Sequence, residues 1–287
     1  MTTDQSPTQS PTLDSLDVIE TGGHLRAVEV EVTATPAEVW EAIATPQGNA
    51  GWSFPTEIEG RIGGEVRIHR QPYGGTAVAT VVAWDPPHRL AWDEARSTVP
   101  GGDDVGEPWA LELLVEARSG GTCIVRVVSG FRRHGEAWED MVDGAAEGWR
   151  GALAILAGYL AHFRGQPVAT FDASATLDRP RSDAAAVGAD LFAALGLTGL
   201  EVGDRFETPA GAPALSGVVD QVSSVGLLLH ATAPHPALVE VSGFWMPGAG
   251  VLSTVAFRYY GDGAEAAVAE QGPEWQRWIA EHAQQHA

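Results

Sequence analysis

The chain has 287 residues, of which 44% are hydrophobic and 19% charged. This composition is typical of a folded globular protein, and the length suits two domains. The formal net charge of −21 repels phosphate backbones and anionic lipid headgroups, so we expect neither a nucleic acid nor a membrane surface as a partner. A lone Cys123 excludes an internal disulfide and fits a reducing compartment. We therefore expect a cytoplasmic protein.

Residues 1–23 are rich in Ser, Thr, Gln, Pro and Asp, which cannot build a hydrophobic core. They show neither the basic start nor the apolar run of a secretory signal. We expect a disordered tail.

Residues 24–166 predict one α+β domain. The stretch HLRAVEVEVTA from His24 alternates apolar and acidic residues, which indicates a half-buried strand. The stretch TPAEVWEAI follows, with Thr35 and Glu38 spaced as a capping box at the start of a short helix. A second strand follows Gly63 and Gly64.

Two further strand pairs are predicted before a long helix. VVAWDPPHRLAW predicts two strands joined at residues 85–87, because Pro cannot donate to a strand ladder. WALELLVEARSGGTCIVRV predicts a hairpin that turns at residues 119–121. Residues 138–163 repeat apolar positions at spacings of three and four, which indicates an amphipathic helix. A curved antiparallel sheet around one helix accounts for all of these apolar faces.

Residues 167–287 repeat this order in weaker form. VVDQVSSVGLLLH corresponds to VVAWDPPHRLAW without the prolines, and EVGDRFE corresponds to RIGGEVR. Five corresponding elements in one order favour a duplication. We expect a diverged second domain whose closing helix is interrupted at Gly272-Pro273, and we expect the first domain to hold the better pocket.

The motifs TPAEVWEAIATP, FPTEIEGRIGGEVRIH, VVAWDPPHRLAW, GGTCIVRV and GWRGALAILAGYLAHF closely resemble the START-like (SRPBCC) helix-grip superfamily. Within it, they are most similar to the branch named for the activator of Hsp90 ATPase. The resemblance runs from about residue 24 to 166 and is looser beyond. It implies two tandem helix-grip domains, each a curved antiparallel sheet wrapped around a C-terminal helix. It also implies a hydrophobic ligand held between sheet and helix, and some members are polyketide cyclases or aromatases.

We therefore expect the first domain to bind or carry a small hydrophobic or aromatic molecule. We expect Ala145 and Gly148 to leave room beneath the long helix. The predicted cavity lining consists of Trp52, Phe54, Val66, Ile68, Trp92, Trp109, Leu111, Leu113, Val125, Met141, Ala145 and Trp149. The same residues are also explained by a solid core.

The sequence places no catalytic residue, cofactor or metal ligand set in this cavity. His69 alternates with Val66 and Ile68 and is expected on the outer face, and Glu57, Glu59 and Arg61 read as solvated surface. Two alternative functions stay open. One is a polyketide cyclase- or dehydratase-like enzyme, which requires an inward acid or base. The other is a chaperone-associated module for an unidentified protein partner.

Overall fold

The computed structural model describes residues 19–20, 24–71, 74–94, 108–131, 139–223, 226–246 and 249–285. The first half contains β1 (Ile19–Glu20), β2 (His24–Val32), α1 (Pro36–Ala44), α2 (Pro46–Ala50), β3 (Thr56–Ile58), β4 (Glu65–His69), β5 (Thr76–Asp85), β6 (Arg89–Glu94), β7 (Trp109–Ala117), β8 (Cys123–Phe131), α3 (Glu139–Gly158) and a π-helical turn (Tyr159–Phe163). The second half contains β9 (Val168–Leu177), a 3₁₀ turn (Arg181–Asp183), α4 (Ala184–Ala194), β10 (Arg205–Glu207), β11 (Ser216–Val222), β12 (Gly226–Ala233), β13 (Ala237–Met246), β14 (Gly250–Tyr260) and α5 (Ala264–Gln285).

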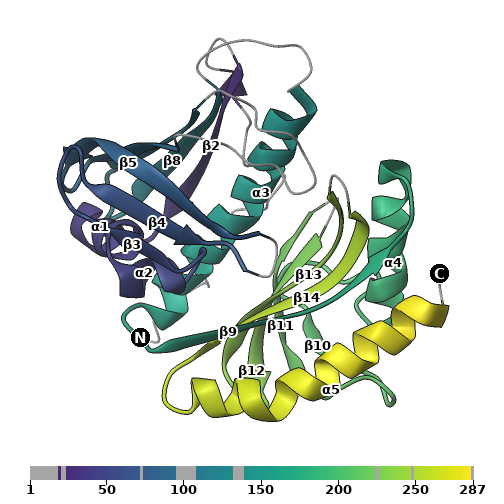
Figure 1. The fold of residues 1–287 in the computed structure, drawn as a ribbon. Helices are drawn as coiled ribbons and strands as arrows, with labels where there is room; N and C mark the ends of the chain where they lie inside the picture. The colour runs from purple at the N-terminus through teal and green to yellow at the C-terminus, as the bar shows by residue number, and fades with distance from the viewer. Residues whose placement is uncertain are drawn as a thin grey trace, which may run out of the picture.

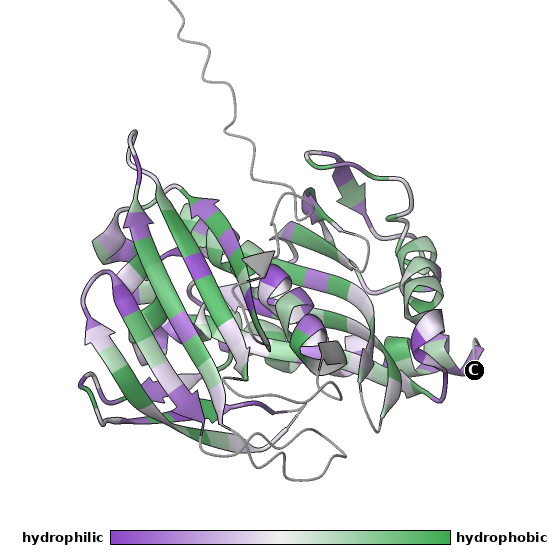
Figure 2. Ribbon diagram, turned by 90° about the horizontal axis from the view of Figure 1, so that it is seen from above, coloured by the Kyte–Doolittle hydropathy of each residue, from purple (hydrophilic) through white to green (hydrophobic). Residues whose placement is uncertain are grey.

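The first sheet has eight strands in the order β1-β2-β8-β7-β6-β5-β4-β3, and every neighbouring pair is antiparallel. Apolar residues alternate with polar ones along its strands, visible as alternating colours in Figure 2. The apolar side chains face α3, which closes one side of the sheet. The short β1 lies within the predicted tail, whose other residues fall outside the described ones.

The capping box predicted before α1 is present. The Thr35 backbone N–H donates to Glu38 Oε2 at 2.7 Å, and the Glu38 backbone N–H donates to Thr35 Oγ1 at 3.4 Å. These bonds satisfy two donors that the start of a helix leaves unpaired. They also stabilise the Glu38 carboxylate, which lowers the pKa of Glu38.

The second sheet repeats the pairing order of the first. Its order is β10-β11-β12-β13-β14-β9, so the opening strand β9 pairs with the last strand β14, as β2 pairs with β8. Strands β11 and β12 stand where β5 and β6 stand in the first sheet, and β3 has no counterpart among the described strands. The α+β fold with two sheets and two closing helices is thereby confirmed.

The predicted interruption of the second closing helix is wrong, because α5 runs from Ala264 to Gln285 with Pro273 inside it. Gly272 is buried, and a methyl group added there would lie 3.2 Å from the Phe171 ring. Trp275 and Ile279 are both fully buried against the sheet. Anchoring on both sides of Pro273 keeps the helix continuous despite the missing backbone donor.

The two domains pack together through α3, which lies between the two sheets (Figure 1). One face of α3 packs on the first sheet, while Leu228, Leu238 and Tyr260 of the second sheet join the same buried cluster. The Tyr260 hydroxyl donates to the Gly51 carbonyl at 2.6 Å, and its ring stacks on Phe163 with centroids 4.1 Å apart. α4 and α5 cover the opposite face of the second sheet. None of the helices in the described part of the chain is long and apolar enough to cross a membrane.

Candidate functional site

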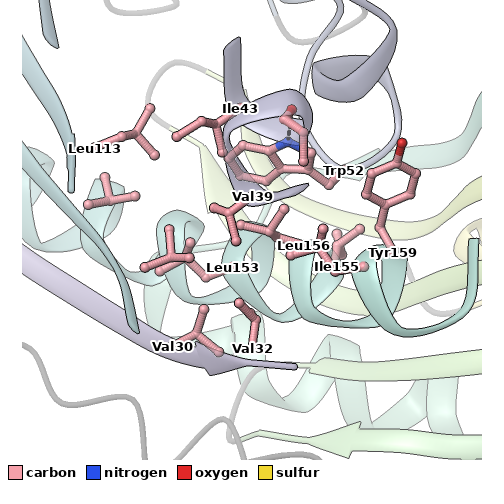
Figure 3. Close-up of a cluster of buried hydrophobic side chains, with 14 of the residues drawn as sticks. Val30, Val32, Val39, Ile43, Trp52, Leu113, Leu153, Ile155, Leu156 and Tyr159 are labelled. Carbon is pink, nitrogen blue, oxygen red and sulfur yellow. Dashed lines mark hydrogen bonds between the residues drawn. The ribbon is translucent and has the colours of Figure 1, made fainter. Parts of the chain in front are cut away.

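The interior of the first domain is solid beneath the C-terminal half of α3. Trp52 is 1% exposed, and its indole N–H donates to the Ala42 carbonyl at 3.0 Å. Leu153 and Leu156 of α3 are fully buried in the same cluster, together with Val39 and Ile43 of α1, as Figure 3 shows. This end of the domain is hydrophobic core.

Most of the predicted lining residues meet in that one cluster. Its buried members from the prediction are Trp52, Val66, Ile68, Trp92, Leu111, Leu113 and Val125, and the half-buried Phe54 and Trp149 pack against it. Trp109 and Ala145 belong to a separate small cluster with Phe131 and Val142, at the N-terminal half of α3. Met141 lies in α3, but its side chain falls outside the described part of the structure.

The expectation that Gly148 leaves room beneath the helix is wrong. Gly148 is exposed, and a methyl group added there would lie more than 4 Å from the described atoms of every other element. Ala146 is the small residue that faces the core, at 2% exposure. The predicted apolar positions Leu153, Leu156 and Leu160 are buried, but Ala146, Ala154 and Ile155 are buried as well. The apolar side of the helix is therefore wider than predicted, because the helix packs on both sheets.

Trp92 on β6 provides an unpaired polar group in this interior. Its side chain is 5% exposed and packs in the main cluster, but its indole N–H has no hydrogen-bond acceptor among the residues that the structure describes. Buried donors in folded proteins nearly always have an acceptor, and an unmatched one costs about 1–3 kcal/mol. The N–H group is enclosed by protein atoms, so a ligand oxygen could reach it only after neighbouring side chains move.

Glu94 is a buried acid that the sequence reasoning missed. Leu90, Trp92 and Glu94 alternate along β6 and share the face toward α3. The Glu94 side chain is 3% exposed and accepts an ion-paired hydrogen bond from Arg70, whose side chain is 33% exposed. The signal was present in the letters RLAWDE, because the same alternation that turns Trp92 inward also turns Glu94 inward.

Further polar groups lie on the same face of the neighbouring strands. Trp92 pairs with Leu111 of β7, Leu111 with Ser129 of β8, and Ser129 with Arg26 of β2. Ser129 is buried, and Arg26 Nε donates to Asp143 Oδ1 of α3 at 2.9 Å. The end of the domain near the start of α3 thus combines aromatic walls with a few polar groups, an arrangement typical of small-molecule sites.

The polar surface residues considered from the sequence lie outside this site. His69 Nε2 lies 3.0 Å from Glu57 Oε1, and Arg61 pairs with Glu59 at 2.7 Å on the exposed edge of β3 and β4. Cys123 is fully buried, its thiol donates to the Ala34 carbonyl, and burial raises the pKa of Cys123. No group of three or more His, Cys, Asp or Glu in the described ranges is arranged to hold a metal ion.

Comparison with known families returns one match. Residues 33–161 match the family described as "Activator of Hsp90 ATPase homolog 1-like protein", which confirms the resemblance for the first domain. No curated protein matches the chain at a significant level.

Comparison with solved structures returns matches of low sequence identity. The di-domain ARO/CYC protein BexL of the BE-7585A biosynthetic pathway is 15% identical, with 90% of this chain and 98% of that chain covered and a TM-score of 0.42. DynU16, from the dynemicin biosynthetic locus, is 18% identical, with coverage of 91% and 97% and a TM-score of 0.41. The Aha1 dimer of Colwellia psychrerythraea is 18% identical, covers 47% of this chain and 95% of its own, and has a TM-score of 0.39.

Proposed function

We propose that the first domain binds a small, largely apolar ligand. Residues 33–161 match the family described as "Activator of Hsp90 ATPase homolog 1-like protein". The ligand lies between the sheet and the N-terminal half of α3. The observation that carries the proposal is the buried indole N–H of Trp92, for which the described part of the chain provides no acceptor. Transfer of apolar ligand surface from water contributes about 25 cal/mol per Å² before the costs of association.

The surrounding side chains favour an aromatic ligand that carries one oxygen. Trp109 and Phe131 meet edge to face with ring centroids 4.9 Å apart, and Trp109 pairs with Glu94 across β7 and β6. Flat apolar walls suit a planar ring system. Once the side chains around it move, the Trp92 N–H would donate to an oxygen on that ring. A ligand hydroxyl would have the buried Glu94 carboxylate, on the same strand, as an acceptor candidate.

Binding of 2-naphthol and of naphthalene tests this proposal, because the two probes differ by a single hydroxyl. We expect 2-naphthol to bind more tightly than naphthalene in isothermal titration. Trp92→Phe keeps the ring and removes the N–H, so it should weaken 2-naphthol binding about fivefold, as loss of one hydrogen bond implies, and leave naphthalene binding unchanged.

Trp84→Phe is the matched control. The Trp84 ring packs against the Trp40 ring with centroids 5.0 Å apart, and the proposal gives its N–H no contact with the ligand. This substitution should change neither affinity. Ala145→Trp should block both probes. Equal binding of the two probes to the wild type, or no binding of either, would contradict the proposal.

A second candidate function is a cyclase- or dehydratase-like enzyme, and Glu94 is the observation that favours it. This candidate required an inward acid or base, and Glu94 faces the interior with Arg70 as its partner. A buried carboxyl at a ligand site is a candidate for proton transfer. Conversion of a poly-β-keto thioester probe that Glu94→Gln abolishes, with probe binding retained, would favour catalysis over carriage.

A further inference from the structure

Two histidines from different domains stack on each other where the domains meet. His162 lies in the π-helical turn that ends α3, and His230 lies on β12 of the second sheet. Their ring centroids are 4.5 Å apart, with an angle of 30° between the ring planes. The Phe163 ring meets the His230 ring edge to face, with centroids 5.2 Å apart. The two imidazole rings are therefore part of the contact between the domains.

The position of His230 connects this stack to the hydrophobic core that the domains share. His230 pairs directly with Leu238 of β13, and a methyl group added at Gly158 of α3 would lie 3.0 Å from a Leu238 methyl group. Phe163 stacks on Tyr260 of β14 with centroids 4.1 Å apart. A change in the charge of the histidine rings therefore acts directly on the packing of the second sheet against α3.

Charged and titratable side chains surround the stack on four elements. They are Asp220 of β11, Glu240 of β13, Arg258 and Tyr260 of β14, and Arg164 just after the π-helical turn. Arg164 is ion-paired with Glu38 of α1, and Arg258 acts on Glu240. Asp220 is the acid that acts on His162. One carboxylate can offset a single positive charge on the two rings, but not two.

The contact favours neutral histidine rings. His230 is half-buried, and its removal from water lowers the pKa of His230 below the ordinary value of 6.5, while His162 lowers it further. Neither ring has a hydrogen-bond or ion-pair partner among the residues that the structure describes. Two imidazolium rings 4.5 Å apart repel each other more strongly in a partly buried contact than in water. Such coupled rings take up their protons in two steps, and the second step is the unfavourable one.

We propose that the stacked pair of His162 and His230 is a pH-sensitive contact between the domains, which holds the second sheet on α3 while at most one ring is charged and weakens this packing when both are charged. The contact is fully stabilising above pH 6.5, because His230 is then neutral in both the folded and the unfolded chain. As the pH falls below 6.5, the unfolded chain binds the His230 proton first. The stabilisation is then lost progressively, until the folded protein has taken up the proton as well. This contact does not depend on the ligand proposed for the first domain.

Urea unfolding of the full chain on both sides of pH 6.5 tests the proposal through the variant His230→Phe, which keeps an aromatic ring in the stack and cannot be charged. Relative to the wild type, the folding equilibrium constant of this variant should rise as the pH falls below 6.5. The rise should be about tenfold for each unit by which the contact lowers the pKa of His230. Asp220 and Glu240 contribute with the opposite sign, because burial raises the pKa of both carboxyls. They are present in both proteins, so their contributions cancel in the comparison.

The protonation of His230 is followed directly through the NMR signals of the imidazole rings, which are assigned by their loss in the single variants. His162→Phe, at an exposed position, keeps a ring in the stack and removes its charge, so the pKa of His230 should rise. A role of the stack in packing alone would not move this pKa. The matched control is His282→Gln, because His282 is also half-buried and stacks on Trp278 of α5 with centroids 5.4 Å apart; it should leave the protonation of His230 as in the wild type.

Two results would overturn the proposal. One is a stability difference between His230→Phe and the wild type that stays constant as the pH falls below 6.5. The other is a pKa of His230 that His162→Phe leaves unchanged.

Discussion

Glu240 is an acidic residue at the junction of the two domains. It lies on the face of β13 turned toward α3, where a methyl group added at Gly151 would lie 3.5 Å from its Oε1. Removal from water raises the pKa of Glu240, Arg258 offsets part of this effect, and Asp172 adds to it. The folded protein therefore holds this proton to higher pH than the unfolded chain does.

The free energy of unfolding depends on pH because the folded and unfolded states bind the Glu240 proton with different affinity. Above pH 4.5, the ordinary pKa of this carboxyl, the unfolded chain loses the proton first, so the contribution of Glu240 to the free energy of unfolding falls as the pH rises. Glu240→Gln removes this loss. In urea unfolding we expect the stability of the variant relative to the wild type to rise as the pH increases above 4.5, until the Glu240 carboxyl of the folded protein has itself ionised. Glu116→Gln, at an exposed position of β7, is the control, and a gain independent of pH would contradict the assignment.

Residues such as Glu240 also explain why the contact between the second sheet and α3 could not be predicted from the sequence. Glu240, Arg258 and His230 alternate with buried apolar residues on the strands of the second sheet, and such alternation ordinarily indicates a face in water. Here that face packs on α3. A period of two tells which residues share a face, but not whether a second domain covers it.

The order of the strands was largely predictable, because turn residues and the alternation of apolar and polar residues mark the same strand boundaries. Asp85 ends β5 and Arg89 begins β6, as the proline pair predicts, and the turn at Gly120 and Gly121 has the positive φ angles that Gly tolerates. The additional buried positions of α3, such as Ala154 and Ile155, were not predictable. Its residues serve two partners, so the apolar stripe is wider than one sheet needs.

Gly158 tests this shared packing. It has helical dihedral angles, but a methyl group added there would lie 3.0 Å from a Leu238 methyl group of the second sheet. Gly158→Leu should therefore destabilise the protein by about 1–3 kcal/mol through crowding rather than backbone strain. Gly148→Leu makes the same change at an exposed position with no neighbour within 4 Å, and it should stabilise by up to about 1 kcal/mol through helix propensity. Urea unfolding of both variants measures the difference, and equal effects would contradict the packing described.

For the whole molecule, the main hydrophobic cluster crosses the boundary between the domains. Leu228, Leu238 and Tyr260 from the second domain are buried in it together with Tyr159 and Phe163 from the first. Removing the second domain would expose the outer side of α3 to water, which removes hydrophobic stabilisation.

The full chain should therefore unfold in a single calorimetric transition, although it has two sheets. A shortened chain of residues 1–166 should unfold at lower temperature and self-associate through the uncovered side of α3. Calorimetry and light scattering measure both properties. A shortened chain that stays monomeric with the melting temperature of the full protein would contradict a shared core.

Burial of α3 on two sides limits the routes by which the proposed ligand can enter the first domain. A helix pressed between two sheets cannot swing outward as a hinged cover would, because outward movement drives Gly151 and Gly158 into Glu240 and Leu238. The first turns of α3 are less confined, since Asp143, Gly144 and Gly148 are all exposed. Under the proposed function, a ligand should therefore enter and leave near the first turns of α3 rather than by outward movement of the whole helix.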